Sequence, residues 1–399
     1  MPPLPFYYVV VVWGEKYVDL FLNVALPCLL APGNLPGLPN LRESRFLVVT
    51  TRRDWERIVG SPVFQTLRKL VEPAFIALPS TEDKTSHYFK AAKGHQAAAR
   101  LALENNAFCV YLGPDFLLSD GALRSLVQLA SSGKQAVLVP GMRVSSETIL
   151  AELSKIYSAQ TNNDVLSFAP RTLVDLCLPR IHPENQRYNW DHPYFSQSPV
   201  LCTWSVPGEQ GLLVRAFHLH PLLVKINKSE SLALLDTNTI DDEFLGFNFS
   251  NWQVIHVETD SDNIVLFSLT EDGERHEALI RNSAGIQKLR DMAYSPRCNP
   301  LHRYFFTKAI KLHTGALNKT WSRIEDETGF LAYQVLKYDP TTAAYLRHVG
   351  GRLLLREVIN RVRKRAVRLL SGIGKTTTRF VSYISRLRGS VTVVRKPGH

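Results

Sequence analysis

Short apolar runs alternate with longer amphipathic segments over the first 140 residues of the chain. The runs are five to eight residues long, which is typical of strands that are buried on both faces. This pattern predicts strands at 6–13, 45–51, 74–78, 108–112 and 135–141. It predicts helices at 16–30, 54–60, 85–106 and 120–133, with caps at Thr85 or Ser86 and at Ser119 or Asp120.

This alternation predicts an α/β fold with a mixed, mainly parallel central sheet that helices cover on both faces. In such sheets, ligands bind beyond the carboxyl ends of the strands. The residues predicted at that edge are Trp13-Gly14, Thr50-Thr51-Arg52 and Asp115.

After about residue 200 the pattern changes to strand-like runs joined by short turns, with no helix predicted between them. These runs are expected to add antiparallel strands to the sheet. From about residue 281 the apolar spacing is helical, which predicts a C-terminal helical extension. The late strands are predicted at 199–204, 211–224, 252–259 and 263–269.

The net charge of +11 is concentrated at the C-terminal end. Between Gly350 and His399 there are 13 Lys and Arg residues and one acid, Glu357, so this segment carries +12 and the rest of the chain −1. Residues 351–371 also show apolar positions at helical spacing. Such a cationic amphipathic helix is typical of one that lies on an anionic membrane surface, or of one packed on a domain with a solvated basic face. Nucleic acid is disfavoured as a partner, because residues 351–371 contain no aromatic side chain for stacking.

The cysteine pattern favours an intracellular location. The five cysteines form no CxxC pair and lie mostly in apolar runs, so we expect reduced core residues. No run approaches the roughly 18 apolar residues of a spanning helix, and the first apolar run lacks a basic flank typical of a signal peptide. The expected location is the cytoplasm, with peripheral attachment to the inner face of the cell membrane.

The predicted strand 108–112 ends at Gly113-Pro114 and is followed by one carboxylate, Asp115. An aspartate here can cap a turn. It can also hold a divalent cation against a diphosphate, because it lies at the edge where such sheets bind ligands.

The segment VYLGPDFLLSDGALRSL (110–126) resembles the aspartate-motif segment of GT-A-fold glycosyltransferases. In that family an apolar strand ends in Asp-x-Asp after three strand–helix units, and an acid-capped helix follows. The resemblance covers residues 6–225. It implies that Asp115 binds Mn²⁺ or Mg²⁺ together with a nucleotide diphosphate sugar. Gly113 occupies the place of the first aspartate, so the ribose contacts of that residue are not implied.

His218 and His220 are two residues apart in the predicted strand 211–224, so both side chains are expected on one face. Two such imidazoles can bind one metal ion, although each can equally be an ordinary core or surface histidine. Enzymes with the GT-A fold often complete their metal site with a late histidine. The resemblance therefore implies His220 or His218 as the second ligand, with His220 preferred because Pro221 ends the strand just after it.

A literal Asp-x-Asp sequence occurs at Asp260-Ser261-Asp262, between two predicted strands. Asp and Ser favour turns, so a hairpin turn is one interpretation and a metal site the other. Its position is too late in the chain for the family motif, which makes it the weaker candidate.

An inverting glycosyltransferase needs a carboxylate that accepts the proton of the acceptor hydroxyl. The acidic run Asp241-Asp242-Glu243 has apolar flanks, and Asp241 or Asp242 could serve as this base. Glu209, in the turn PGEQG, is the competing candidate.

The nucleotide requires an apolar surface and a few polar contacts near the ends of the first strands. Trp13, Gly14, Thr51 and Arg52 are suitably placed for this role. Lys93 borders the long helix and could contact phosphate, although an exposed helix lysine is more often only solvated.

The leading hypothesis is a metal-dependent glycosyltransferase that transfers a sugar to a glycan or lipid-linked acceptor in surface polysaccharide or glycoconjugate synthesis. One alternative is a non-catalytic module that binds a glycan or a partner. Another is a different nucleotide- or cofactor-dependent transferase such as a methyltransferase, although no glycine-rich turn follows the first strand. The expected domains are a catalytic domain at 1–280 with halves 1–150 and 151–280, a helical extension at 281–350 and a basic tail at 351–399.

Overall fold

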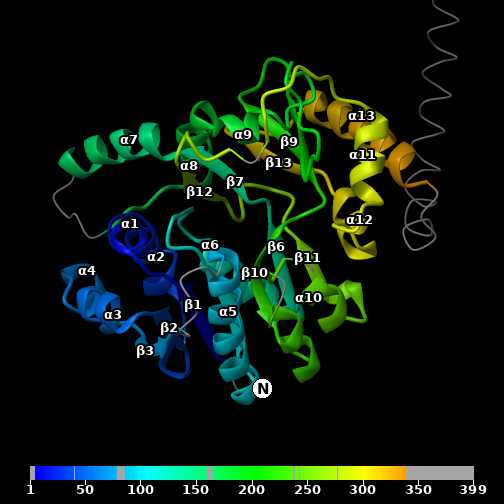
Figure 1. Cartoon of the computed structure of the whole chain (residues 1–399). Helices are drawn as coiled ribbons and strands as arrows, with labels where there is room; N and C mark the ends of the chain where they lie inside the picture. Colours follow the sequence, from blue (N-terminus) through cyan, green and yellow to red (C-terminus); the bar gives the residue numbers. More distant parts are fainter. Residues whose placement is uncertain are drawn as a thin grey trace, which may run out of the picture. The chain divides into compact units, whose positions relative to one another are not determined.

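A seven-stranded sheet forms the centre of the part of the chain that the structure, a computed structural model, describes (Figure 1). The described residues are 5–39, 41–78, 86–159, 165–236, 239–241, 243–275 and 277–337. In order across the sheet, the strands are β11 (Ile255–Val257), β6 (Ala136–Val139), β10 (His220–Lys225), β4 (Phe108–Leu112), β1 (Phe6–Val11), β2 (Arg45–Thr50) and β3 (Glu72–Ala77).

The sheet is mixed and mainly parallel. β1 runs parallel to β2 and β4, β2 runs parallel to β3, and β11 runs parallel to β6. β10 is inserted antiparallel between β4 and β6. The first residue of β10 therefore lies at the edge where β1, β4 and β6 end. The α/β architecture predicted from the sequence is confirmed.

Helices cover both faces of this sheet. Phe21, in the helical segment formed by α1, η1 and α2, stacks on Phe46 of β2 with ring centroids 6.2 Å apart. Gly94 of α5 packs against Val11 of β1 and Val49 of β2. Phe46 and Val49 lie on opposite faces because side chains alternate along a strand. The elements are α1 (Glu15–Leu20), the π-helical turn η1 (Phe21–Ala25), α2 (Leu26–Leu29) and α5 (His87–Glu104).

Two smaller sheets provide the antiparallel additions predicted for the later part of the chain. One is β5 (Phe116–Leu118), β12 (Leu266–Thr270) and β7 (Met142–Ser145), in which β12 pairs antiparallel with β5 and parallel with β7. The other is the antiparallel sheet β13 (Ile310–His313), β9 (Gly211–Ala216) and β8 (Leu201–Ser205).

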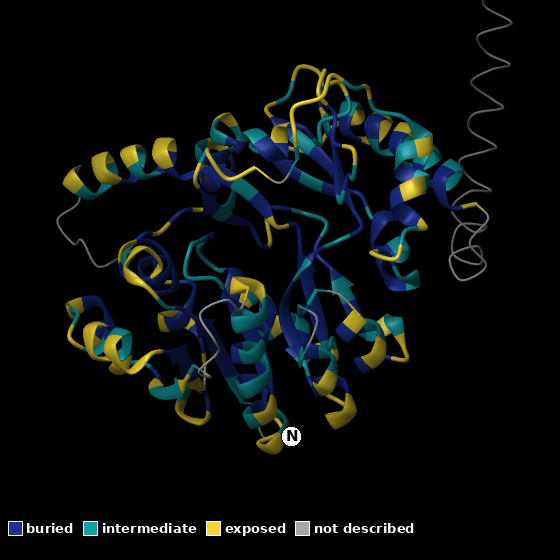
Figure 2. Ribbon diagram, viewed as in Figure 1, coloured by how far each residue is buried: buried dark blue, intermediate teal, exposed yellow. Residues whose placement is uncertain are grey.

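The remaining elements surround these sheets, and exposed residues gather on their outward faces, as on α7 (Figure 2). The α-helices are α3 (Arg52–Val59), α4 (Pro62–Arg68), α6 (Ala122–Ser131), α7 (Ser146–Ala159), α8 (Pro170–Cys177), α9 (Pro183–Gln186), α10 (Glu243–Asn248), α11 (Ile286–Ala293), α12 (Pro300–Phe306) and α13 (Lys319–Leu336). The short 3₁₀ helices are η2 (Leu35–Gly37), η3 (Leu41–Glu43), η4 (Leu178–Arg180), η5 (Ser229–Asp236) and η6 (Trp252–Val254).

Three sequence predictions about these elements are wrong. The predicted strand 211–224 is two strands, because the chain bends at residues 217–219 and moves from the β9 sheet to the central sheet. η5 and α10 lie between β10 and β11, where no helix was predicted. β13 interrupts the segment predicted to be helical and pairs with β9.

The predicted cap of α6 is also wrong. The helix follows Gly121, whose φ of 86° lies in the left-handed region, and no side chain caps it. Asp120 instead accepts hydrogen bonds from the Gly33 backbone N–H at 2.5 Å and from the Ser167 hydroxyl at 2.8 Å. The Ser119 hydroxyl accepts from the backbone N–H of Val265 at 3.1 Å. Both side chains therefore connect distant segments.

No helix within the described ranges is long and apolar enough to cross a membrane. The predicted basic tail at 351–399 lies outside the described residues, so its helix and its membrane contact remain predictions.

The packing of α5 on the sheet gives a test of the fold. A Cβ added at Gly94 would lie 2.6 Å from Val11 Cγ1 and 3.3 Å from Val49 Cγ1. We expect Gly94→Ala to destabilise the protein by about 1–3 kcal/mol, because overpacking outweighs the gain in helix propensity. The measurement is the urea unfolding midpoint.

Gly246 of α10 is the matched control. The nearest atom to an added Cβ there is Asn299 Nδ2 at 3.8 Å, which is an ordinary contact. Gly246→Ala should raise stability by about 0.5–1 kcal/mol. A Gly94→Ala variant as stable as Gly246→Ala would contradict the close packing of α5 on β1 and β2.

Candidate functional site

The carboxyl edge of the central sheet collects most of the predicted site residues. β1, β4 and β6 end there, and they are followed by Trp13-Gly14, by Asp115 and by Gly141 respectively. β10 starts at the same edge with His220, because it runs antiparallel to β4 and β6. Segments far apart in the sequence thus deliver polar side chains to one region.

The side chains of Phe116 and Asp115 crowd the position of Gly113. A Cβ at this position would lie 2.6 Å from Cδ1 of Phe116 and 2.8 Å from Oδ1 of Asp115. A second carboxylate cannot occupy position 113 while the Phe116 ring stays in place. A side chain at position 113 would thus require Phe116 and Asp115 to move, and Asp115 is the one acid that β4 delivers to this edge.

The Asp115 carboxyl group lies among charged groups from other elements. Burial raises its pKa to about 6, against the opposing effects of its own backbone N–H and of the Arg143 and Lys16 charges, while Glu274 raises it further. Lys16 forms ion pairs with Glu271 at 2.8 Å and with Glu274 at 3.7 Å. Two cations, Arg143 and Lys16, thus act on Asp115, and the acids Glu271 and Glu274 pair with Lys16.

A cavity of about 270 Å³ opens beside this cluster. Arg143 lines it and also acts on Asp115, so the cavity and the carboxylate share one cation. The lining combines imidazole, carboxylate, guanidinium and amide groups with apolar and aromatic side chains. Its residues are Phe116, Gly141, Arg143, Asn185, Tyr188, Val200, Leu201, His218, Leu219, His220, Asp241, Leu266 and Ser268.

His220 is held in one orientation at the cavity wall. Its Nε2 lies 3.0 Å from the carbonyl oxygen of Tyr111, and its ring meets the Phe116 ring edge-on at 5.1 Å. A carbonyl only accepts, so Nε2 carries the proton and Nδ1 is the lone-pair atom of the neutral ring. Burial lowers the pKa of His220, which favours this neutral form.

His95 of α5 is a further histidine at this position. Its ring meets the Tyr111 ring edge-on at 5.2 Å. Burial, together with the neighbouring His220, lowers its pKa to about 4. His95 and His220 are therefore both neutral at pH 7.

His218 does not share a strand with His220. It lies in the bend before β10, and its ring lies against the ring of His302 with centroids 4.3 Å apart. Its Nε2 is 3.8 Å from Sγ of Cys298. Burial lowers the pKa of His218 to about 4. The premise that strand alternation puts both histidines on one face is wrong, although both line the cavity.

Asp241 lies between the two histidine groups. Its negative charge opposes the lowered pKa of His95, His218 and His220 alike. Its backbone carbonyl accepts from Nε2 of His302 at 3.0 Å. Asp241 is thus a carboxylate at the cavity wall beside neutral imidazoles. Asp242, the other candidate base, lies outside the described residues.

The residues predicted to contact the nucleotide lie together at the ends of β1 and β2. The Gly14 N–H donates to Oδ2 of Asp54 at 3.0 Å, and the Thr51 hydroxyl donates to the same oxygen at 2.8 Å. Trp13 stacks on His87 with centroids 6.3 Å apart. Arg52 pairs with Glu56 at 3.2 Å in an exposed position. Asp54 therefore connects the two strand ends.

Two predicted residues lie apart from the cavity. The Lys93 ammonium pairs with Asp236 of η5, and this contact lowers the pKa of Asp236. Glu209 lies in the turn between β8 and β9 and accepts from Asn318. The six residues of β9, about 20 Å of strand, separate this turn from the bend that carries His218.

The Asp260-Ser261-Asp262 segment forms a turn with two side-chain ties. Asp260 accepts from the backbone N–H of Asp262 at 2.9 Å and contacts Nε2 of the buried His313 at 2.9 Å. Arg171 binds both carboxylate oxygens of Asp262, at 2.8 and 2.7 Å. The three groups could in principle hold a cation. Their present contacts fit the turn interpretation.

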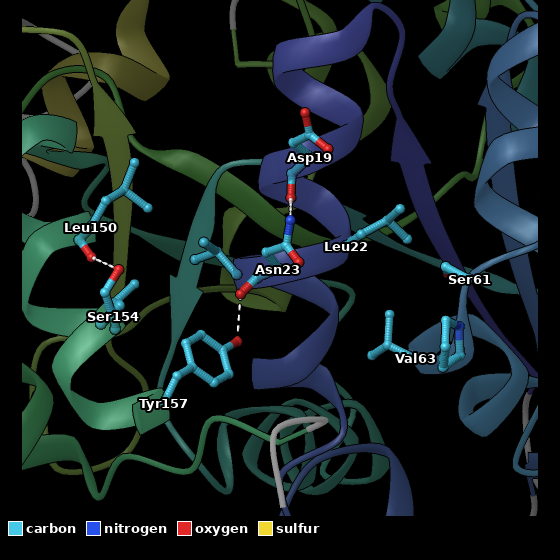
Figure 3. A pocket seen from close by; sticks show the side chains of 11 residues that line it. Asp19, Leu22, Asn23, Ser61, Val63, Leu150, Ser154 and Tyr157 are labelled. Carbon is cyan, nitrogen blue, oxygen red and sulfur yellow. Dashed lines mark hydrogen bonds between the residues drawn. The ribbon is translucent and has the colours of Figure 1, made fainter. Parts of the chain in front are cut away.

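A larger hollow of about 580 Å³ lies away from this edge, between α1, α4 and α7 (Figure 3). Tyr157 donates from its hydroxyl to the Asn23 carbonyl across it. Asp19 is the one charged residue of its described lining and pairs with Arg57. The described lining of the hollow therefore offers one carboxylate, which is already paired, and no histidine, cysteine, lysine or arginine.

The sequence reasoning missed five groups around the cavity edge. Arg143 and Lys16 follow β6 and β1 closely, so the same rule that selected Asp115 could have selected them. No local signal points to the others, because only tertiary packing brings them in. These are His95, Cys298 and His302.

Comparisons with known proteins give no family assignment. No protein-family model and no curated protein matches the chain. The crystal structure of S. aureus TarS aligns over 84% of this chain and 44% of its own, with 11% identity and a TM-score of 0.29. A putative glucose-1-phosphate thymidylyltransferase from Bacillus anthracis, solved in complex with a sucrose, aligns over 36% of this chain and 57% of its own, with 11% identity and a TM-score of 0.25. This chain thus spans less than half of the TarS chain, and at these TM-scores neither alignment is an argument about function.

The charge of Asp115 gives a test of this site. We expect its carboxyl group to titrate with a midpoint near pH 6 in ¹³C NMR, assigned by the signal that Asp115→Asn removes. Arg143→Gln should raise the midpoint further, because the Arg143 cation stabilises the carboxylate.

The raised pKa of Asp115 also predicts how the stability of the protein changes with pH. The folded pKa lies above the reference value of 3.8, so the stabilisation from protonated Asp115 is full below that value and is lost as the pH rises through about 6. Asp115→Asn should therefore gain stability relative to the unsubstituted protein between about pH 4 and 7. A midpoint at or below pH 4 would contradict the burial of this carboxyl group.

Proposed function

We propose that the protein is a glycosyltransferase that takes its sugar from a nucleotide diphosphate donor and acts at the carboxyl edge of the central sheet. The observation that carries this proposal is that Arg143, His220 and Asp241 line one cavity. Asp115 lies beside that cavity, within reach of the Arg143 charge. The sequence resemblance to the GT-A aspartate motif ends on Asp115, at the same edge.

The donor chemistry around Asp115 fits Mn²⁺ or Mg²⁺. The Asp115 carboxylate is ionised above about pH 6 and supplies a hard oxygen ligand. His220 has its Nε2–H held by the Tyr111 carbonyl, which is the arrangement that fixes a ligating imidazole in the correct tautomer. When bound, the cation would neutralise charge on the leaving diphosphate.

Arg143 and Lys16 supply the remaining positive charge. Diphosphate oxygens are well matched by a guanidinium fork and by an ammonium group. Lys16 is paired with Glu271 and Glu274 at exposed positions, where an ion pair contributes little stability. We infer that the diphosphate displaces Glu271 and Glu274 from the Lys16 ammonium group.

Asp241 is the base that the geometry favours for the acceptor hydroxyl. It lines the cavity, and the neighbouring histidines are neutral, so no cationic imidazole competes for its charge. Glu209 is disfavoured because the length of β9 lies between it and this region. The acceptor class, a glycan or a lipid-linked sugar, follows from the resemblance alone.

Calorimetric titration with UDP and GDP, with and without Mn²⁺, tests donor binding. We expect binding that strengthens with Mn²⁺ and with rising pH through about 6, because the Asp115 carboxylate must be ionised. Asp115→Asn and Arg143→Gln should each weaken binding about tenfold or more, roughly 1.4 kcal/mol. Asp262→Asn is the control and should change binding less than twofold. No nucleotide binding, or equal loss in the control, would refute the proposal.

Donor-sugar turnover followed by mass spectrometry separates an enzyme from a binding module. Asp241→Asn should leave nucleotide binding within about twofold and lower turnover by about 100-fold or more, since general base catalysis contributes that much. Nucleotide binding without any turnover in the presence of acceptor glycans would favour the non-catalytic alternative.

The basic segment 351–399, outside the described residues, supports a second proposal about location. We expect full-length protein to sediment with anionic liposomes and a chain truncated at Gly350 to remain in the supernatant, because the truncation removes the +12 charge. Raising the salt concentration should release the full-length protein. Equal sedimentation of both chains would exclude this segment as the membrane contact.

A further inference from the structure

A second cluster with metal-ligand chemistry lies at the other side of the cavity. One ring nitrogen each of His218 and His302 and the Cys298 sulfur all lie within 4.8 Å of one another. Cys298 and His302 are buried, and His218 is partly exposed and lines the cavity. The three side chains come from the bend before β10, from the residues before α12 and from α12 itself.

From this cluster we infer a binding site for Zn²⁺ with His218, Cys298 and His302 as its three protein ligands. Two imidazoles and one thiolate are donors that zinc prefers, whereas Mn²⁺ and Mg²⁺ prefer oxygen. The site is therefore chemically distinct from the Asp115 region, where the charged ligand is a carboxylate oxygen.

The distance between His218 and Cys298 is close to that in a tetrahedral zinc site, and the His302 nitrogen lies within 4.8 Å of both. Nitrogen and sulfur ligands of one zinc ion lie roughly 3.6 Å apart, given bond lengths of about 2.0–2.1 and 2.3 Å. The observed separation of His218 Nε2 and Cys298 Sγ is 3.8 Å. Only a small contraction would bring both atoms onto one ion.

His302 has the tautomer that a ligating histidine needs, and its Nδ1 is part of the capping box that begins α12. Its Nε2–H donates to the Asp241 carbonyl at 3.0 Å, so the lone pair lies on Nδ1. Ligating histidines commonly donate their other ring N–H to a backbone carbonyl in this way. Nδ1 accepts from the Asn299 N–H at 3.2 Å, and the ion would replace that contact. A ring nitrogen of His302 lies within 4.8 Å of the Cys298 sulfur.

The charge balance of binding is simple. The Cys298 thiol releases its proton to solvent as the thiolate–zinc bond forms, and both imidazoles bind in neutral form. Three protein ligands leave one tetrahedral position for water, a pattern found at zinc sites that remain open. His218 and the proposed base Asp241 line the same cavity, so an ion held by His218 would lie near the proposed acceptor region.

Titration of metal-free protein with Co²⁺ and Zn²⁺ tests the site without any measurement of activity. We expect one Co²⁺ per chain with a thiolate-to-cobalt charge-transfer band, displaced by one equivalent of Zn²⁺. Cys298→Ser should abolish the band and weaken Zn²⁺ binding at least 100-fold. Cys202→Ser, a change at another buried cysteine, is the matched control and should leave both unchanged.

Further variants keep the test decisive if Cys298→Ser does not fold. His218→Gln should weaken Zn²⁺ binding at least tenfold, and Asp115→Asn should leave it unchanged because that residue belongs to the other region. A missing thiolate band in the unsubstituted protein, or Zn²⁺ binding that survives Cys298→Ser, would overturn the inference. Loss of nucleotide binding with intact Zn²⁺ binding would refute the proposed function alone.

Discussion

The antiparallel insertion of β10 between β4 and β6 is the constraint on which the site depends. Backbone hydrogen bonds to both neighbours hold this strand, so its first residue is fixed at the edge where the parallel strands end. The pairing with β6 shifts register between Pro221 and Leu223, which accommodates a proline without an N–H donor. His220 is therefore held by strand pairing as well as by the Tyr111 carbonyl.

Burial keeps the histidines around the cavity uncharged, so this region carries less positive charge than its residue types suggest. Desolvation keeps His95, His218 and His220 neutral. Arg143 lines the cavity and its charge also acts on Asp115. The same burial holds the Asp115 carboxyl group partly protonated near pH 6. A ligand that brings negative charge thus meets one strong cation and a set of neutral donors and acceptors.

The sequence predicted the first half of the fold well, because β1, β2, β4 and β6 are buried on both faces and appear as uninterrupted apolar runs. The prediction of one strand at 211–224 failed at residues 217–219, because the apolar pattern continues there while the chain passes from one sheet to another. Phe217 shows why: it stacks on Phe306 with centroids 4.1 Å apart, a partner 89 positions away. β13 was missed for the same reason, as its pairing with β9 is non-local.

A site residue could be predicted where its position just after a strand places it at the carboxyl edge of the sheet. Asp115 was found by this rule, and Arg143 follows the same rule. His302 and Cys298 were not predictable, because they reach His218 only through the packing of α12. The structure adds that Phe116 and Asp115 crowd Gly113, which the sequence showed only as a departure from a motif.

The crowding at Gly113 has a consequence for the order of events at the proposed donor site. With one acid where the motif has two, the protein alone offers a divalent cation little negative charge, and Arg143 opposes its approach. A nucleotide diphosphate carries the missing charge itself. In the proposed reaction, Asp115 would therefore hold the cation once a nucleotide diphosphate is bound, and the cation would offset charge on the leaving diphosphate.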